Sequence, residues 1–279
     1  MPPALLAAIP SPSNGSLTLG PLRLNAYGLM IALGVIAAVR IAGKRAESRG
    51  VASRDDLSAI AMWGVPAGVI GGRMYHVVTS LESFRGNWAE AFYIWHGGLG
   101  IWGGITAGVL AGMWKARRLG LDPVAVLDCA APGIAVAQAV GRWGNWFNQE
   151  LFGRPTSLPW ALEVSAAKAQ AAGYPAGTTF HPTFLYESLA CLLLAWVLVR
   201  TEGRPGNRRG RTFLFYVAGY TVFRFFIEGL RVDPAHHVGG MRLNQWVSLG
   251  VFAAAAAAIV ASRRRAEPDE GASTVNDHE

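Results

Sequence analysis

Long apolar runs separated by short polar stretches constrain the fold of this 279-residue chain more than any other feature. A helix needs about 20 mostly apolar residues to cross the hydrocarbon core of a bilayer. Only 15% of the residues are charged, whereas an average soluble domain has about a quarter. The sequence therefore predicts an all-α polytopic membrane protein with about seven transmembrane helices. We place them near 25–43, 57–80, 97–114, 122–141, 183–200, 211–230 and 243–262.

The basic residues predict how these spans are oriented. Connections on one side of the predicted membrane carry 15 Lys and Arg residues, and those on the other side carry 7. Because the cytoplasmic side is the more basic one, the N-terminus is expected outside and the C-terminus in the cytoplasm. The net charge of +7 is thus interpreted as a signal of topology rather than of nucleic-acid binding.

We expect one transmembrane catalytic domain over 1–262. The long connection 142–182 is predicted to form a small extracytoplasmic head. The remaining stretch, 263–279, is rich in charge and poor in hydrophobic residues, which is typical of a disordered tail.

Several classes of site are not expected from the motifs. The two cysteines, Cys129 and Cys191, both lie in predicted spans, so they indicate neither a disulfide framework nor a metal site. The HExxH and GxSxG motifs of zinc and serine hydrolases do not occur. We therefore predict no metal and no cofactor.

The sixth span, "GYTVFRFFIEGLR", carries a stripe of polar residues through an apolar helix. At about 100° per residue, the four side chains fall within an arc of roughly 80°. Such a stripe must face the protein interior or a wet cavity. The residues of the stripe are Tyr220, Arg224, Glu228 and Arg231.

Two interpretations of the stripe are open. Arg224 and Glu228 could form an internal ion pair that only fixes helix packing. Alternatively, two arginines with one acid leave positive charge that a phosphate would complement.

The fourth span ends in "GRWGNWFNQELFG", which brings more polar residues to the same predicted outer depth. Arg142 and Glu150 could form a salt bridge there, with Asn145 and Asn148 capping the turn. Together with the stripe of the sixth span and with Tyr27 of the first, the cluster instead predicts a site for a lipid headgroup. A further stretch, "HPTFLYES", opens the fifth span with His181, a candidate polar contact, and Glu187, which could equally cap its helix.

These stretches resemble the bacterial prolipoprotein diacylglyceryl transferase family. "GRWGNWFNQELFG" is similar to the family pattern G-R-x-[GA]-N-F-x-N-x-E-x-x-G, with Trp146 in place of the usual Phe. The resemblance continues, in the family's order, through "LGPLRLNAYGLM", "GGRMYHV", "WHGGLGIWGG", "HPTFLYES" and "GYTVFRFFIEGLRVDP", and covers roughly residues 17–250.

The resemblance implies transfer of the diacylglyceryl group of phosphatidylglycerol to the lipobox cysteine of a preprolipoprotein signal peptide. A thioether forms and glycerol 1-phosphate leaves, at the outer leaflet of the bacterial cytoplasmic (inner) membrane. The expected partners are these two substrates and membrane lipid, without nucleic acid. The expected catalytic residues are Arg142, Arg224, Glu150 and Tyr27. Expected to bind the phospholipid are Arg142, Asn145, Asn148, Gly153, His181, Tyr220, Arg224, Glu228 and Arg231.

One departure from the family leaves the general base open. Many members have a His-Gly-Gly at the start of the third span, where this chain has Trp102. A thiol with a pKa of about 8.5 needs help to ionise. The candidates are Glu150, Tyr27 and His96, in that order; alternatively, the positive charge of the arginines lowers the thiol pKa enough without a base.

A transporter of an anionic lipid or phosphate ester is the alternative, since it would also use buried Arg–Glu pairs. Transporters of that kind carry polar residues through the full depth of the membrane and paired, discontinuous helices. This sequence is polar mainly in one leaflet and has no evident repeat.

Overall fold

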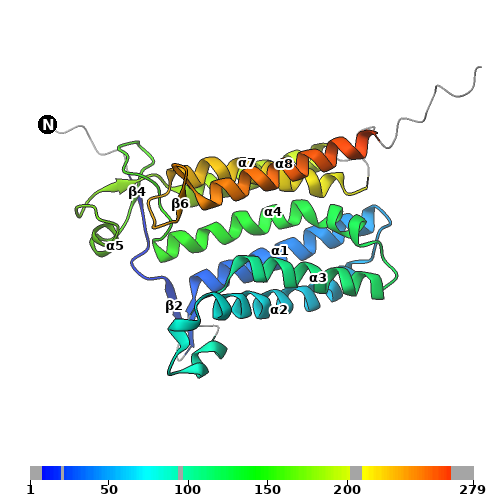
Figure 1. Cartoon of the computed structure of the whole chain (residues 1–279), viewed down its shortest axis with the longest axis horizontal. Coiled ribbons are helices and arrows are strands. Elements are labelled where there is room, and N and C mark those ends of the chain that lie inside the picture. Colours follow the sequence, from blue (N-terminus) through cyan, green and yellow to red (C-terminus); the bar gives the residue numbers. More distant parts are fainter. Residues whose placement is uncertain (1–7, 20–21, 94–96, 202–208, 265–279) are drawn as a thin grey trace, which may run out of the picture. The chain divides into compact units, whose positions relative to one another are not determined.

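The computed structural model describes residues 8–19, 22–93, 97–201 and 209–264, and most of these residues are helical (Figure 1). In chain order the helices are α1 (Ala26–Ser48), α2 (Arg54–Thr79), the 3₁₀ helices η1 (Leu81–Phe84) and η2 (Trp88–Phe92), α3 (Ile101–Arg118), α4 (Pro123–Asn148), α5 (Ala166–Ala171), α6 (Thr183–Thr201), α7 (Arg211–Leu230) and α8 (Leu243–Arg264). The strands are β1 (Ile9–Pro10), β2 (Ser16–Leu19), β3 (Leu22–Asn25), β4 (Leu162–Glu163), β5 (Thr179–Phe180), β6 (His237–Val238) and β7 (Met241–Arg242).

Each of the seven ranges predicted to span the membrane overlaps a helix of the structure, although the third, 97–114, is helical only from Ile101. Among the described residues, five helices are long and apolar enough to cross a bilayer, namely α1, α4, α6, α7 and α8. The chain is thus a mostly helical, polytopic membrane protein. A count of seven spans and the orientation of the termini stay predictions.

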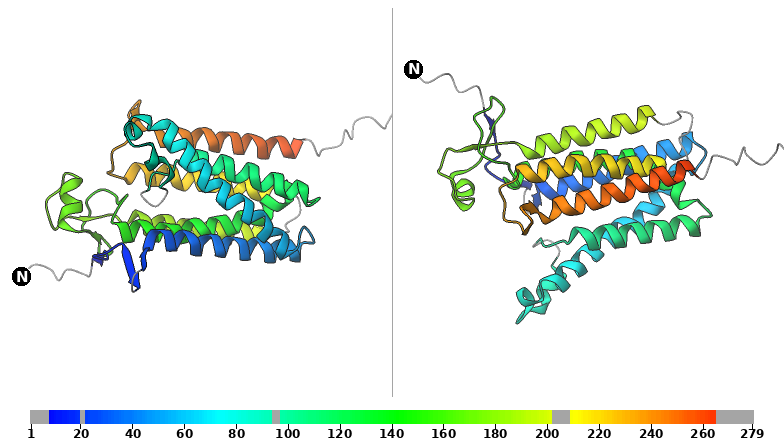
Figure 2. Two further views of the ribbon diagram at one scale, coloured as in Figure 1. Left: turned by 90° about the horizontal axis from the view of Figure 1, so that it is seen from below. Right: turned by 45° about the horizontal axis from the view of Figure 1, so that its top comes forward.

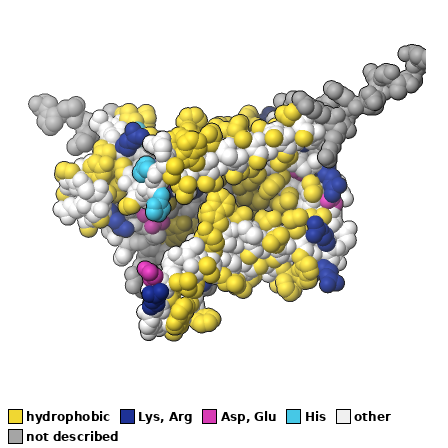
Figure 3. All heavy atoms as spheres, viewed as in Figure 1, with side chains coloured by type: hydrophobic (Ala, Val, Ile, Leu, Met, Phe, Trp, Pro, Cys, Tyr) yellow, Lys and Arg dark blue, Asp and Glu magenta, His cyan; other side chains and the backbone are white. Residues whose placement is uncertain are grey.

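The outer surfaces of these helices are apolar. Figure 3 shows hydrophobic side chains over the helices on its visible face. On α6, Leu189, Leu193 and Trp196 are each more than half exposed. Because helices satisfy their own backbone hydrogen bonds, such surfaces are stable against lipid.

The chain divides into two compact units, one of residues 1–38 and 131–279 and the other of residues 39–130. In the first unit, α7 packs between α6 and α8 (Figure 2). Its core consists of Ala131, Ala135, Leu194, Ala195, Leu198 and Tyr216. Small residues let α1 and α4 approach closely, since a Cβ added to Gly34 of α1 would lie 2.9 Å from the carbonyl oxygen of Ala137 of α4.

The second unit is dominated by the packing of α2 against α3. Glycines line this interface, and a Cβ on Gly103 would overlap the carbonyl of Gly71. The helix α2 begins three residues before the predicted span because Ser53 and Asp56 form a reciprocal capping box. Buried Arg73 donates to the carbonyls of Ala91 at 2.9 Å and of Gly98 at 3.0 Å, so this arginine holds a loop in place.

The predicted head at 142–182 has its own sheet and core. Strand β4 pairs with β5 antiparallel and with β1, from the N-terminal segment, in parallel. The apolar cluster beneath contains Phe152, Leu162, Val164, Ala169, Phe180 and Phe184. The segment 142–148, predicted to belong to the head, is instead the last part of α4.

Candidate active site

The polar stretch that follows the fourth predicted span remains helical. The helix α4 runs to Asn148, seven residues past the predicted end at 141. Residues three apart on a helix share a face, so Arg142 and Asn145 project from the same side of its last turns. The helix satisfies its own backbone hydrogen bonds, and the polar side chains find partners on other helices of the same unit.

Glu187 of α6 joins the two arginines that the sequence singled out. Its Oε1 accepts a hydrogen bond from Arg224 Nη1 of α7 at 2.8 Å. Its Oε2 forms an ion pair with Arg142 Nε of α4. The side chains of Arg142 and Arg224 are 19% and 17% exposed, and that of Glu187 is 8% exposed. One carboxylate thus fixes two guanidinium groups from two different helices.

Glu228 of α7 is fully buried and accepts from four donors. Its Oε2 receives Arg224 Nη2 at 2.5 Å and Arg231 Nη1 at 3.2 Å. Its Oε1 receives Arg242 Nε at 2.9 Å and Asn244 Nδ2 at 3.2 Å. Because two oxygens offer about four lone-pair positions, this carboxylate is saturated and serves as an anchor for arginines rather than as a proton acceptor.

Asp233 is the third carboxylate of the network. It pairs with Arg231 at 2.7 Å and with Arg242 at 2.9 Å. Burial raises the pKa of the Asp233 carboxyl, but hydrogen bonds and charges from Arg231 and then Arg242 lower it more. The net pKa therefore lies below the usual value of 3.8.

The charges of this network do not cancel. Four arginines, residues 142, 224, 231 and 242, face three carboxylates, residues 187, 228 and 233. The described cluster therefore carries one net positive charge in a largely buried setting. An anion with one negative charge, such as a phosphodiester, complements it.

Tyrosines from two helices border Arg142. The hydroxyl of Tyr220 accepts a long hydrogen bond of 3.4 Å from Arg142 Nη2. Tyr27 of α1 lies close enough to Arg142, Glu150 and the side chain of Asn145 to interact with all three. A Cβ on Gly144 would come within 2.5 Å of the Tyr27 ring, so the glycine is what lets this ring pack against α4.

Glu150 follows α4 and has a different environment from Glu228. Its Oε1 accepts from Asn145 Nδ2 at 2.9 Å and from Asn148 Nδ2 at 3.5 Å. Its Oε2 accepts no hydrogen bond from the residues that the structure describes. The sequence left an Arg142–Glu150 salt bridge open, but in the structure Arg142 pairs with Glu187.

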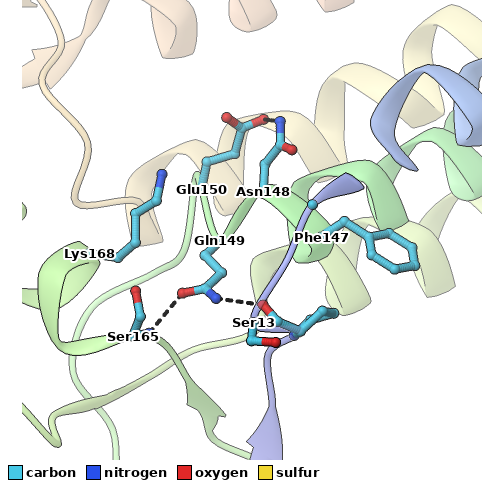
Figure 4. A pocket seen from close by; sticks show the side chains of 9 residues that line it. Ser13, Phe147, Asn148, Gln149, Glu150, Ser165 and Lys168 are labelled. Atoms are coloured by element: carbon cyan, nitrogen blue, oxygen red, sulfur yellow. Dashed lines mark hydrogen bonds between the residues drawn. The ribbon is translucent and has the colours of Figure 1, made fainter. Parts of the chain in front are cut away.

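The turn that presents Glu150 has unusual backbone geometry. Gln149 and Leu151, on either side of it, have φ values of 52° and 58°, which non-glycine residues rarely adopt. The buried Gln149 side chain donates to the carbonyl of Pro12 at 2.7 Å and accepts from Ser165 N at 2.7 Å (Figure 4). These two bonds tie the turn to the N-terminal segment and to the head.

Next to this turn lies a pocket of about 310 Å³. Its walls come from three segments, residues 12–15, 147–150 and 165–168. Glu150 and Lys168 are the ionisable groups in these walls. The pocket therefore borders the candidate catalytic carboxylate on the side of the head.

Gly153 and His181 form the junction between the head and α6. The backbone N–H of Gly153 donates to the carbonyl of His181 at 2.9 Å. His181 Nδ1 lies 3.1 Å from the Tyr186 hydroxyl, which also accepts from Trp160 Nε1 at 2.9 Å. The structure thus joins His181 to head residues, and its contact with substrate stays a prediction.

Two residues discussed for the general base fall elsewhere. His96 lies outside the described residues. Trp102, which stands at the position of the family's usual His, is 45% exposed near the start of α3 in the second unit. Glu150 and Tyr27 are the candidates that the structure places beside Arg142.

Sequence reasoning missed three members of the network. The sequence indicates only a helix cap for Glu187, whereas in the structure its carboxylate bridges Arg142 and Arg224. The sequence predicts no site role for Arg242 or Asp233, although they brace Glu228 and Arg231. All three stand at or near helix ends, where a charged residue is ordinary, so the local sequence carried no signal of their partners.

Comparison with known proteins identifies relatives over nearly the whole chain. The model of one protein family, described as "Prolipoprotein diacylglyceryl transferase", matches residues 15–261. The chain is 48% identical to a protein of Streptomyces griseus named phosphatidylglycerol–prolipoprotein diacylglyceryl transferase, over 93% of this chain and 79% of that protein. A protein of the same name from Cutibacterium acnes is 47% identical over 94% of this chain and 89% of its own length.

Proposed function

The chain belongs to the prolipoprotein diacylglyceryl transferase family, and on that premise we propose that it transfers the diacylglyceryl group of phosphatidylglycerol to a prolipoprotein. The acceptor is the thiol of the lipobox cysteine in a signal peptide. The products are a thioether-linked diacylglyceryl prolipoprotein and glycerol 1-phosphate. The alternative of an anionic-lipid transporter is not favoured by these relatives.

The observation that carries the proposal is the convergence of Arg142 and Arg224 on one carboxylate, Glu187. Guanidinium groups held by fixed partners are preorganised to bind the oxygens of a phosphodiester. The net positive charge of the surrounding network supports the same ligand class. Tyr220 supplies a further polar contact beside Arg142.

The reaction requires little covalent chemistry from the protein. The acceptor sulfur forms a bond to the sp³ carbon of the diacylglycerol that carries the phosphate, and the bond from that carbon to the phosphate oxygen breaks. The electron pair stays on the departing phosphate, where Arg142 and Arg224 stabilise it. The thiol proton must leave as the C–S bond forms.

Glu150 is our candidate for the group that accepts this proton. Its Oε2 has no partner among the described residues, whereas Glu228 is saturated by donors. Asn145 donates a hydrogen bond to the other oxygen of Glu150, and Tyr27 lies close to the same carboxylate. His96 stays an alternative from the sequence.

We place the site at the outer leaflet of the bacterial cytoplasmic (inner) membrane. In the first unit, the cluster lies where α4 and α7 end and where α6 and α8 begin, so it occupies one end of these helices. The chain's more basic connections, by the Lys and Arg count, follow the opposite ends. The head would then receive the signal peptide outside the membrane, a role that a folded and fully active enzyme lacking 156–178 would contradict.

The test uses purified protein with phosphatidylglycerol and a lipobox peptide, and it measures release of glycerol phosphate. A peptide with Cys→Ala gives the release that does not depend on the thiol. Arg142→Ala and Arg224→Ala are expected to abolish thiol-dependent release. Arg200→Ala, which removes an exposed arginine at the other end of α6, is the matched control and should keep it. Folded wild-type protein without thiol-dependent release would refute the proposal.

A further inference from the structure

The pocket beside Glu150 contains polar groups that have no partner within the described protein. The Lys168 side chain forms no ion pair or hydrogen bond with any described residue, although Glu150 lines the same pocket. Figure 4 shows these two side chains extending toward the same side of the pocket, with no interaction between them. Lys168 is exposed, so its ammonium group is free to contact a ligand group that enters the pocket.

The other polar groups of the pocket are hydrogen-bonding but uncharged. The Asn148 amide donates to Glu150, while its Oδ1 accepts nothing from the described residues. The hydroxyls of Ser13 and Ser165 likewise make no hydrogen bond with a described residue. Together with Lys168, these groups offer both donors and acceptors.

The size and charge of the pocket narrow the choice of ligand. A volume of about 310 Å³ lies at the small end of the roughly 300–1,000 Å³ that small-molecule sites occupy, so the pocket has room for a group the size of glycerol. One carboxylate and one ammonium leave the walls without net charge, which suits a neutral group rich in hydroxyls.

The pocket also adjoins the candidate phosphate site, because Glu150 accepts a hydrogen bond from Asn145, which lies three residues after Arg142 on α4. If Arg142 and Arg224 bind the phosphate, the attached headgroup would therefore reach the pocket on the side of Glu150. We propose that this pocket binds the glycerol moiety of the phospholipid headgroup, with Lys168 donating to one of its hydroxyls. Lys168 is thus a specificity-determining residue, and this inference rests on the proposed function.

The same glycerol group occurs in the donor lipid and in the released glycerol 1-phosphate, so the test has two arms. The first compares kcat/KM for phosphatidylglycerol and for phosphatidylethanol, whose headgroup lacks both hydroxyls. The second measures inhibition by added glycerol 1-phosphate, with inorganic phosphate as the probe without glycerol.

Lys168→Met keeps the length of the side chain and removes its donors. We expect it to lower kcat/KM about tenfold for phosphatidylglycerol, as loss of a hydrogen bond from a charged donor predicts, and to leave phosphatidylethanol unchanged. It should weaken inhibition by glycerol 1-phosphate to a similar degree without affecting inhibition by phosphate. Lys168→Arg is expected to restore most of the selectivity.

Gln170→Glu is the matched control. Gln170 is exposed on the same short helix α5 but does not line the pocket, and its substitution changes the net charge by the same amount as Lys168→Met. Residues two apart on a helix do not share a face, so this variant should behave as wild type.

Three results would overturn the inference. The first is a wild-type kcat/KM that is equal for phosphatidylglycerol and phosphatidylethanol, and the second is an equal fall of kcat/KM for both lipids in Lys168→Met. The third is a Lys168→Met enzyme in which only the inhibition by glycerol 1-phosphate changes. Wild-type protein that transfers from neither lipid would contradict the proposed function instead. The two failures are therefore distinguishable.

Discussion

Replacing Glu187 by Gln tests whether one carboxylate positions both arginines. In the structure each Glu187 oxygen serves a different arginine, Arg224 at Oε1 and Arg142 at Oε2. The substitution Glu187→Gln turns one of these oxygens into an NH₂ group, which points a donor at a guanidinium that has only donors. One arginine must therefore lose its contact, while the volume of the side chain stays nearly the same.

The size of the effect follows from the contact that is lost. A hydrogen bond to a charged group contributes about 1.5–3 kcal/mol, which corresponds to roughly 10- to 150-fold in kcat/KM if the released arginine no longer holds the phosphate. Since the freed arginine is less than one-fifth exposed, the thermal midpoint should fall as well.

The assay is the initial rate of thiol-dependent glycerol phosphate release, together with a thermal unfolding scan in the same detergent. Glu163→Gln makes the same chemical change at an exposed position on β4 and should leave both measurements unaltered. A Glu187→Gln enzyme with wild-type kcat/KM and an unchanged midpoint would refute the bridging role of Glu187.

Three further predictions concern stability. Gly153→Ala would bring a Cβ within 2.8 Å of His181 Cβ and should cost about 1–3 kcal/mol, seen as a lower thermal midpoint, whereas Gly250→Ala meets nothing within 4 Å and should be neutral or slightly stabilising. Because folding lowers the pKa of Asp233, the ionised carboxylate contributes fully to the stability of the fold above the usual pKa of 3.8, and this contribution is lost as the pH falls through the lowered pKa. Thermal midpoints measured from about pH 5 to about pH 3 should therefore decline less in Asp233→Asn than in the wild type. An identical decline in both proteins would contradict this. Arg242→Lys should lower the midpoint, since an ammonium cannot reproduce the three contacts of Arg242 with Glu228, Asp233 and the Arg231 carbonyl; a midpoint equal to that of wild type would show that these contacts are not needed.

The positions of the helices could be predicted because apolar runs of the right length have few alternatives in a membrane. Helix ends were harder to place. The helix α4 continues to Asn148 since its polar residues find partners on α1 and α6, which the local pattern does not reveal. The parallel pairing of β1 with β4 joins segments some 150 residues apart, and strands of two residues carry no periodicity.

The polar stripe of α7 could be predicted for a similar reason, because charged residues inside an apolar helix are costly unless they are paired or functional. Its partners could not be predicted. Glu187 lies 37 residues from Arg224, and Arg242 lies 14 residues from Glu228 across a β-turn region. Each looks like an ordinary residue at the start of a helix, and only the packing of α6 and α8 against α7 brings them into the network.

The buried network combines the two interpretations of the stripe, an internal ion pair that fixes helix packing and a positive site for a phosphate. Arg224 does pair internally with Glu228, at 2.5 Å, as a packing role requires. Pairing does not exhaust the charge, since four arginines face three carboxylates. In the proposed reaction the phosphate gains negative charge as its bond to carbon breaks, so a fixed positive cluster stabilises the transition state more than the bound lipid. The carboxylates are then what makes the site catalytic, because they hold the arginines in place before the charge develops and no rearrangement is needed when it does.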